Sequence, residues 1–211
     1  GTTDGVLSTG SPGTEPADKY NYDPDNPVPT VGGNHSICWG QAFHMIQPGP
    51  FDQREVEARK DVLVYTTPPL DEPLEVTGPI KVTLFASTDG LDTDWTAKLT
   101  DVHPDGRSIN LTEGVIRARF RKSIYKAPEL LKPGEVFEYT IELLPTSNVF
   151  LQGHRIRLDI TSSNFPLWDR NPNTGHEQGK DAELRVAHQT VYHDTTRPSR
   201  LTLPVILANP S

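Results

Sequence analysis

The stretch richest in side chains that could do chemistry runs from Asp159 to His176 and reads DITSSNFPLWDRNPNTGH. It offers Ser162 and Ser163 as hydroxyl nucleophiles, but nucleophilic catalysis needs a base within hydrogen-bond reach, and no histidine is placed beside either serine. We therefore interpret the stretch as an ordered loop that binds or packs. Its candidate site residues are Asn164, Phe165, Pro166, Trp168, Asp169, Arg170 and Asn171.

The residue types in this loop predict how it is held. Asn164 and Asp169 can cap backbone groups through short side-chain hydrogen bonds. Pro166 stiffens the path of the chain, while Phe165 and Trp168 supply apolar area for anchoring. We expect a loop of defined shape.

A second candidate site is the acidic turn STDGLDTDW, in which Asp89, Asp92 and Asp94 lie close together beside a glycine. Loops of β-sandwiches can bind Ca²⁺ through such carboxylates. The simpler interpretation, which we favour, is a turn whose aspartates hydrogen-bond their own backbone. No cofactor is predicted.

The other reactive residue types give little. His188 and His193 are five apart on a predicted strand and so point to opposite faces, and no other histidine pair has ligand spacing, which argues against a transition-metal site. Cys38, in CWGQAF, is similar to the nucleophile of papain-like proteases, but no helix pattern follows it, and an inert thiol is the simpler interpretation. No serine has the G-x-S-x-G context of an α/β-hydrolase.

Arginines and tryptophans suggest binding rather than catalysis. Arg117, Arg119 and Arg121 alternate along VIRARFR, and such a stripe could hold an anionic partner. Glu138 and Glu142 lie on the polar face of the next predicted strand, so cross-strand ion pairs of at most about 1 kcal/mol each are the simpler account.

Sugars stack on exposed aromatic rings, so the three tryptophans raise a carbohydrate-binding alternative. Trp95 alternates with Ala97 and Leu99 and is predicted to be in the core. Trp168 lies outside any periodic segment and could be exposed, and Trp39 lies in the N-terminal region. One loop aromatic is weak support for sugar binding.

The elements that must position these residues are predicted to be strands. From Asp61 onward, apolar and polar side chains alternate in short segments separated by turns such as HPDGRS and KPGEV, without amphipathic helices between them. Such a pattern predicts antiparallel sheets in two layers. We expect an all-β fold, a jelly-roll β-sandwich of eight to ten strands, each buried on one face. The predicted segments are VLVYTT, GPIKVTLFAS, DWTAKLTD, VIRARFR, VFEYTIEL, HRIRLDIT, VAHQTVYH and SRLTLPVIL.

Residues 1–60 are predicted to form an extended N-terminal arm or linker, and residues 61–211 the sandwich. The arm is punctuated by Pro, Gly, Asn and Asp and shows no run long enough to name an element, although extended arms usually lie along a surface. DQREVEARK is compatible with one or two helical turns.

The bulk properties exclude several classes of partner. The net charge of -8 and isoelectric point of about 5.3 argue against non-specific binding to nucleic acid or anionic membrane. With one cysteine no intrachain disulfide can form, and no apolar run approaches the ~18 residues of a membrane span. We expect a soluble protein; the compartment stays open, with the cytoplasm favoured.

Four long segments carry a resemblance to a known family: DVLVYTTPPLDEPLEVTGPIKVTLFAST, DTDWTAKLTDVHPDGRSINLTEGVIRARFR, LKPGEVFEYTIELLPTSNVFLQGHRIRLDITSSNFPLWDRNPNTG and QTVYHDTTRPSRLTLPVI. In this order, over nearly all of residues 61–206, they resemble the C-terminal domain of the X-Pro dipeptidyl-peptidase and cocaine esterase family of serine hydrolases. Upstream, YNYDPDNPVPTVGG and GPFDQREVEARKD resemble the segment that joins this domain to the catalytic one.

The resemblance implies a galactose-binding-like jelly roll that follows an α/β-hydrolase domain with a helical cap. In the family, all three triad residues precede the joining segment, which implies that this chain alone does no hydrolysis and that its partner is the α/β-hydrolase domain in cis. By analogy, the Asn164 to Asn171 loop would face that partner and help to form the substrate entrance. The alternatives are a loop that only closes the sandwich, a homo-oligomer formed through the same face, and a free-standing carbohydrate-binding module.

Overall fold

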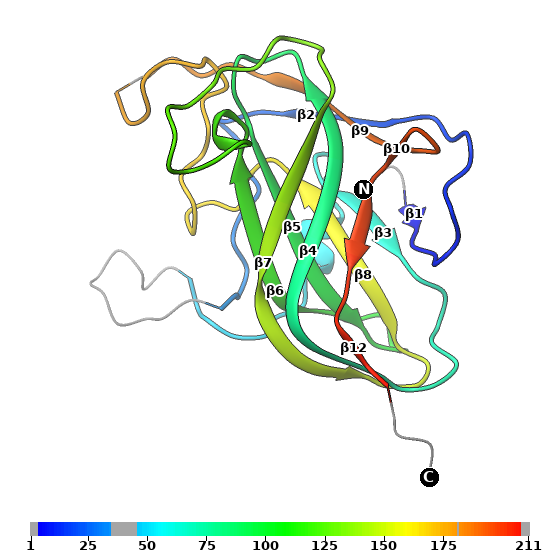
Figure 1. The fold of residues 1–211 in the computed structure, drawn as a ribbon. Helices are drawn as coiled ribbons and strands as arrows, with labels where there is room; N and C mark the ends of the chain where they lie inside the picture. The colour runs from blue at the N-terminus through cyan, green and yellow to red at the C-terminus, as the bar shows by residue number, and fades with distance from the viewer. Residues whose placement is uncertain (1–3, 35–45, 181, 208–211) are drawn as a thin grey trace.

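The computed structural model describes residues 4–34, 46–180 and 182–207, and nearly all of its regular structure is β-strand. Two sheets lie face to face, with apolar side chains from both between them (Figure 1). The first sheet has the strand order β1 (Asp4–Val6), β3 (Leu63–Thr66), β8 (Arg155–Thr161), β5 (Asp94–Val102) and β6 (Ser108–Arg117).

The second sheet is built around the long strand β4. Its order is β10 (Arg197–Pro198), β9 (Ala187–Asp194), β4 (Leu74–Thr88) and β11 (Arg200–Thr202). Three more strands join it: β2 (Asp18–Tyr22), which pairs with β9, and β7 (Phe137–Phe150) and β12 (Val205–Ile206), which pair with β4. Apart from the parallel β1–β3 pair and an isolated parallel bridge between Pro29 and Phe165, the pairings in the described part of the chain are antiparallel, as predicted. The β-sandwich is confirmed; the jelly-roll, galactose-binding-like subtype stays a prediction.

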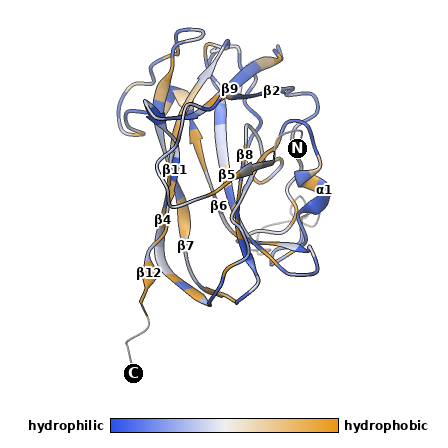
Figure 2. Ribbon diagram, turned by 90° about the vertical axis from the view of Figure 1, so that its right-hand side faces the viewer, coloured by the Kyte–Doolittle hydropathy of each residue, from blue (hydrophilic) through white to orange (hydrophobic). Residues whose placement is uncertain are grey.

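The core lies where the two sheets meet, around the fully buried Trp95 of β5. Its ring contacts Tyr139 of β7, with centroids 5.8 Å apart, and Tyr20 of β2 edge-on at 6.5 Å. Three segments far apart in sequence therefore share one aromatic cluster, and the prediction that Trp95 belongs to the core is confirmed. The hydropathy colouring in Figure 2 shows apolar residues on the strands and polar ones on most connecting loops.

The expectation that every strand is buried on one face is wrong for β5. All nine of its residues are buried, because the segment around α1 (Arg54–Glu57) covers its outer side. Gln53, which precedes α1, accepts a hydrogen bond of 2.8 Å from Lys98 Nζ. The short helix expected in DQREVEARK is confirmed, and its role is to close the outer face of the first sheet.

The predicted strand VIRARFR is shorter than expected. β6 ends at Arg117, and Ala118–Phe120 form a 3₁₀ turn, η2. Because the chain turns there, Arg117, Arg119 and Arg121 do not form one stripe along a strand. β7 pairs with β4 and not with β6, so Glu138 and Glu142 lie opposite Phe85 and Lys81. The predicted cross-strand ion pairs with these glutamates are therefore wrong.

The N-terminal arm contains two strands that the sequence pattern did not reveal. β1 pairs with β3, and β2 extends the second sheet beside β9. Asp18 of β2 accepts hydrogen bonds from Tyr65 Oη at 2.8 Å and lies 3.0 Å from His193 Nε2, and this bond raises the pKa of His193. The arm thus belongs to both sheets. Cys38 and Trp39 lie outside the described residues.

Behind β5, a small cavity of about 20 Å³ separates the first sheet from the covering segment. Asp159 of β8, Glu113 of β6 and Lys98 of β5 line it. Neither oxygen of the Asp159 carboxyl has a hydrogen-bond partner among the described residues. Burial raises the pKa of Asp159 to about 8, with the charge of Glu57 adding to the effect and Lys98 and Arg157 opposing it. Asp159 is thus buried, although the alternation in HRIRLDIT assigns it to the polar side of a strand expected to be buried on one face only.

The raised pKa predicts how stability depends on pH. An unfolded aspartate ionises near pH 3.9, whereas native Asp159 keeps its proton until about pH 8. The unfolded state therefore loses this proton first, and the wild-type chain loses stability as pH rises between these two values. Asp159→Asn removes the titration, so its free energy of unfolding relative to wild type should increase by more than about 1 kcal/mol between pH 5 and pH 8.

The measurement is urea unfolding at several pH values, with the exposed Asp71→Asn as the matched control. Parallel stability curves for Asp159→Asn and wild type would contradict the prediction.

Candidate functional site

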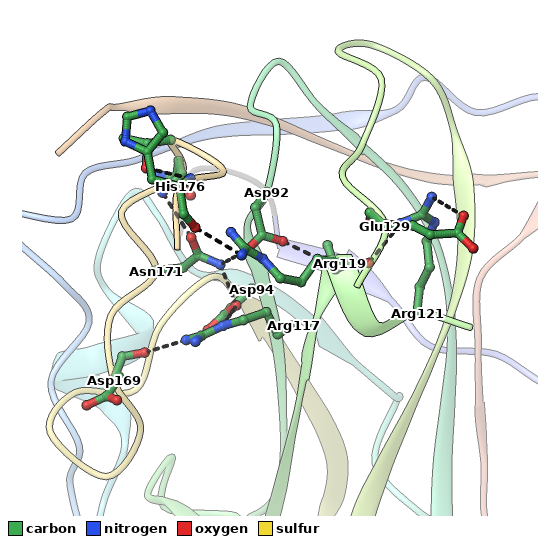
Figure 3. Close-up of polar contacts among 12 residues, drawn as sticks. Asp92, Asp94, Arg117, Arg119, Arg121, Glu129, Asp169, Asn171 and His176 are labelled. Atoms are coloured by element: carbon green, nitrogen blue, oxygen red, sulfur yellow. Dashed lines mark hydrogen bonds and ion pairs between the residues drawn. The ribbon is translucent and has the colours of Figure 1, made fainter. Parts of the chain in front are cut away.

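The candidate loop lies at one end of the sandwich, where three connections meet (Figure 3). They are the turn between β4 and β5, the end of β6 with η2, and the long loop that follows β8. Two sets of residues that the sequence suggested separately, the loop and the acidic turn, are brought together here with the arginines.

Asn171 is the centre of this cluster and is almost completely buried. Its Nδ2 donates to Asp92 Oδ2 at 2.9 Å and to Asp94 Oδ1 at 2.8 Å, while its Oδ1 accepts from the Asn173 amide at 2.9 Å. Tyr22 Oη donates to the Asn171 carbonyl at 3.2 Å. One side chain therefore joins the loop to the acidic turn.

The two buried aspartates are also paired with arginines. Arg117 donates twice to Asp94, each bond 2.9 Å long, and Arg119 Nε donates to Asp92 at 2.6 Å. Burial would lower the pKa of Arg117, but the hydrogen-bonded Asp94 carboxylate raises it overall, whereas burial raises the pKa of Asp94 in spite of the same pair. A buried bidentate pair is geometrically specific as well as stable.

The same arginines reach across to the loop backbone. Arg117 Nη2 donates to the Asp169 carbonyl at 3.3 Å, and Arg119 Nη1 donates to the His176 carbonyl at 3.0 Å (Figure 3). Arg121 points elsewhere, donating to the Glu129 carbonyl at 2.6 Å and lying over the Phe137 ring. Two of the three arginines thus fix the loop.

These contacts change the interpretation of the acidic turn. Asp92 Oδ1 accepts a hydrogen bond from the Arg119 amide, and the remaining hydrogen bonds of Asp92 and Asp94 come from arginine side chains and Asn171. The expectation that these two aspartates cap the backbone of their own turn is therefore wrong. Asp89 stands apart, 3.1 Å from Arg185 Nη2. A calcium ion at Asp89, Asp92 and Asp94 would have to displace guanidinium groups, so this candidate set does not fit the ion well.

The first part of the loop is held from the opposite side. Asn164 Nδ2 donates to Glu113 Oε2 at 2.8 Å instead of capping nearby backbone, contrary to expectation. The backbone of Phe165 bonds to Val28 and Thr30 of the arm, at 2.9 and 2.8 Å. The Phe165–Pro166 peptide bond is cis. The loop is therefore held at both ends by hydrogen bonds, whereas the Phe165 side chain, expected to supply anchoring area, is 40% exposed.

What this loop presents outward is a mixed surface. The side chains of Phe165, Pro166, Asp169 and Arg170 are exposed, whereas Trp168 is half-buried and lines the cavity behind β5. Arg170 is steadied by a hydrogen bond of 2.7 Å from its Nη1 to the Pro24 carbonyl.

Next to the loop, Leu91 and Leu130 are 39% and 45% exposed. They flank Gly175, where an added Cβ would lie 2.7 Å from Leu91 Cβ. Gly175 has φ +79, which also favours glycine. We call this pair the Leu91–Leu130 patch.

The charge network was detectable in principle. Asp92 and Asp94, and Arg117 and Arg119, share the same two-residue spacing, and β5 and β6 are neighbours in sequence joined by a short turn. The register places Asp94 opposite Arg117. Asn171 carried no such signal, because it lies 77 residues from Asp94.

The arrangement can position a loop, but its groups are not those of a hydrolytic centre. Among the residues that the structure describes, four serines are buried, and each is bonded to structural partners. Ser162 lies 2.8 Å from Tyr20 Oη, Ser163 accepts from the Val28 amide, Ser108 bonds to Glu57 and Thr100, and Ser87 bonds to Tyr192. The fold and the site define a β-sandwich module with a rigid, partly apolar end.

Comparisons with known proteins agree with that class. Residues 1–202 match the family model described as the X-Pro dipeptidyl-peptidase C-terminal non-catalytic domain. The chain is 46% identical over 207 residues to the cocaine esterase of Rhodococcus sp. (strain MB1 Bresler) and covers 35% of that protein and 97% of this one. A putative serine esterase of Mycobacterium bovis is 33% identical over 210 residues, covering 90% of this chain and 30% of that protein.

Solved structures give the same result. An aminopeptidase from a marine sediment Thaumarchaeota archaeon has a TM-score of 0.87 and 35% identity, covering 97% of this chain and 35% of that one. An α-amino acid ester hydrolase has a TM-score of 0.85 and 33% identity, covering 96% of this chain and 35% of that one.

The chain therefore belongs to the family of X-Pro dipeptidyl-peptidase C-terminal non-catalytic domains. It spans about one third of the length of the relatives it matches. Neither helix in the described part of the chain has the length or apolar character needed to cross a membrane.

Asn171 should be essential for the order of the loop. Asn171→Ala removes the side-chain hydrogen bonds that join the loop to Asp92 and Asp94. Loss of a buried hydrogen bond to charged groups costs about 2 to 3 kcal/mol of stability. We expect destabilisation of that size together with faster amide hydrogen exchange across residues 164–176.

Urea unfolding and hydrogen exchange read out the two effects. Asn21→Ala is the control, since Asn21 is exposed and bonds only to His188 Nδ1 through its side chain among the described residues. An Asn171→Ala chain as stable as this control would refute the role given to Asn171.

Proposed function

We propose that this chain is the accessory β-sandwich of a serine hydrolase that cleaves acyl esters, amino-acid esters or X-Pro peptide bonds. The observation that carries the proposal is its family match combined with its length. The matched family is described as non-catalytic, and the chain covers 35% of a cocaine esterase and of an α-amino acid ester hydrolase. The catalytic residues would then lie in an α/β-hydrolase domain in cis, and this chain would do no hydrolysis by itself.

The end of the sandwich that carries the loop is the face proposed to meet the hydrolase domain. The Leu91–Leu130 patch offers apolar area there, and Phe165 of the same loop is 40% exposed. Exposed apolar side chains gathered at one place are typical of docking surfaces. The buried charge network beneath supports this use, because a fixed loop loses little conformational entropy on docking.

In this proposal the loop also forms part of the wall of the substrate entrance. Asp169 and Arg170 present opposite charges on exposed side chains; Arg117 holds the Asp169 carbonyl, and the Arg170 side chain is held by its bond to the Pro24 carbonyl. A wall of fixed shape restricts which substrates reach a catalytic centre. The competing proposal, that the loop only closes the sandwich, assigns no role to these exposed charges.

The carbohydrate-binding alternative has less support. Stacking on a sugar needs an exposed ring, but Trp95 is buried and Trp168 is half-buried against the cavity. Tyr125 is 92% exposed, yet a single ring makes no platform. A homo-oligomer formed through the Leu91–Leu130 patch stays compatible with the proposal, because an isolated docking surface favours self-association.

The chain alone is expected to show no turnover of a chromogenic short-chain acyl ester or an X-Pro anilide. A serine-reactive fluorophosphonate should leave it unlabelled, since its buried serines are bonded to structural partners. The assay is absorbance, with mass spectrometry for labelling and a known serine esterase as positive control. Turnover accompanied by labelling of a serine in this chain would overturn the proposal.

Domain exchange tests docking directly. When this chain replaces the matching third of the Rhodococcus cocaine esterase, we expect the exchange protein to keep esterase activity that the truncated esterase lacks. Leu91→Asp with Leu130→Asp should then lower activity at least tenfold, because each change places an unpaired charge in a closed interface.

Val149→Asp is the matched control. Val149 is 45% exposed and pairs with Glu75, at the end of β4 opposite to the patch. Equal activity for the patch variant and this control, or an inactive exchange protein, would contradict docking through this end of the sandwich.

A further inference from the structure

Two histidines and an aspartate meet at the end of the sandwich opposite to the candidate loop. Asp101 lies near the end of β5, His103 begins the turn that follows, and His154 directly precedes β8. The β5–β8 register places Asp101 opposite Ile156 and Val102 opposite Arg155, which brings the two turns together. His154 and Asp101 are 53 residues apart, so sequence spacing could not reveal the cluster.

The possible ligand atoms of the three residues all lie within 4.8 Å of one another. His154 Nδ1 is 2.8 Å from Asp101 Oδ1, and His103 Nε2 is 4.0 Å from Asp101 Oδ2. The two imidazole rings have centroids 4.5 Å apart at an angle of 41°. Side-chain movements of about 1 Å would bring the three atoms to the ~2.0 to 2.2 Å shell of a bound transition metal.

Both turns that carry the histidines are held by backbone hydrogen bonds. The His103 amide donates to the Arg107 carbonyl at 2.8 Å, and the His154 amide donates to the Leu151 carbonyl at 3.0 Å. Leu70 clamps the second turn by accepting from Gly153 and donating to His154. The scaffold is therefore fixed, and preorganised ligands favour metal binding.

The three side chains differ in burial, and the most exposed one gives access from solvent. Those of Asp101 and His154 are 11% and 10% exposed, whereas that of His103 is 30% exposed and gives an entry path from solvent. Arg107 Nη2 lies 3.5 Å from His103 Nδ1, but its Nε donates to Asp105 at 2.7 Å and its side chain is half exposed. Arg107 is thus free to move towards Asp105 and solvent when a cation enters.

We propose that Asp101, His103 and His154 form a binding site for a divalent first-row transition cation of the Zn²⁺ type. Two imidazole nitrogens and one carboxylate suit such ions better than Ca²⁺ or Mg²⁺, which take oxygen ligands. Metal binding through His154 Nδ1 requires the tautomer in which the ring proton is on Nε2, so that the Nδ1 lone pair faces the ion. Water completes the coordination, and the ion ties the β5–β6 turn to the β7–β8 turn.

The competing account is a plain hydrogen bond between Asp101 and His154 that clamps the two turns without metal. The two accounts differ in the role of His103, which that hydrogen bond does not need. His103→Gln leaves the bond intact, so it should fold normally while losing one of the three ligands.

The test is titration of the chelator-treated 211-residue chain with Zn²⁺ by calorimetry and with Co²⁺ by visible absorption. We expect one ion per chain and a rise in melting temperature with Zn²⁺, since a ligand bound only by the native state stabilises it. In His103→Gln the affinity should fall at least about tenfold. His188→Gln, which removes an exposed histidine of β9, should bind as the wild type does.

Circular dichroism confirms that both variants are folded. The proposal is overturned by the absence of saturable binding to the wild type, by unchanged affinity in His103→Gln, or by an equal loss in His188→Gln.

Discussion

Burial of β5 on both faces is the constraint on which the rest of the structure depends. Its inward side chains build the core around Trp95, but the same strand also buries the charged residues Asp94, Lys98 and Asp101, which are 3%, 8% and 8% exposed. Burying a charge without a partner costs several kcal/mol. Each of the three obtains a partner from a different part of the chain: Arg117 and Asn171, Gln53 and Glu113, and His154.

These pairings explain why the connecting segments are ordered although they contain little regular structure. The segment around α1 is held by Lys98, the long loop after β8 by Asn171, and the β7–β8 turn by Asp101. Removing one member of such a pair leaves the other buried without a hydrogen-bond partner, which costs free energy. The order of the connecting segments is therefore coupled to the burial of β5. Asp159 is the exception, since its carboxyl has no hydrogen-bond partner among the described residues and avoids the cost of a buried charge by keeping its proton near neutral pH.

The division of the sandwich into two ends follows from the same strand. One end has paired charges, a fixed loop and the exposed Leu91–Leu130 patch, which suits contact with another domain. The opposite end has the compact group Asp101, His103 and His154, which suits a small cation. Under the two proposals, the first end docks on the rest of a longer polypeptide while the second end stays accessible.

The sequence by itself determined the fold class, the positions of most strands and Trp95 as a core residue, because the period-2 pattern and turn residues are local signals. It also determined the family, because long motifs in a fixed order can be recognised without any knowledge of tertiary contacts. The sequence did not show that β2 completes the second sheet, that β6 stops at Arg117, or that Asn171 joins Asp92 to Asp94. Only the tertiary structure decided these features, because pairing between segments many residues apart depends on sheet order and register, and those are set by the packing of the whole chain.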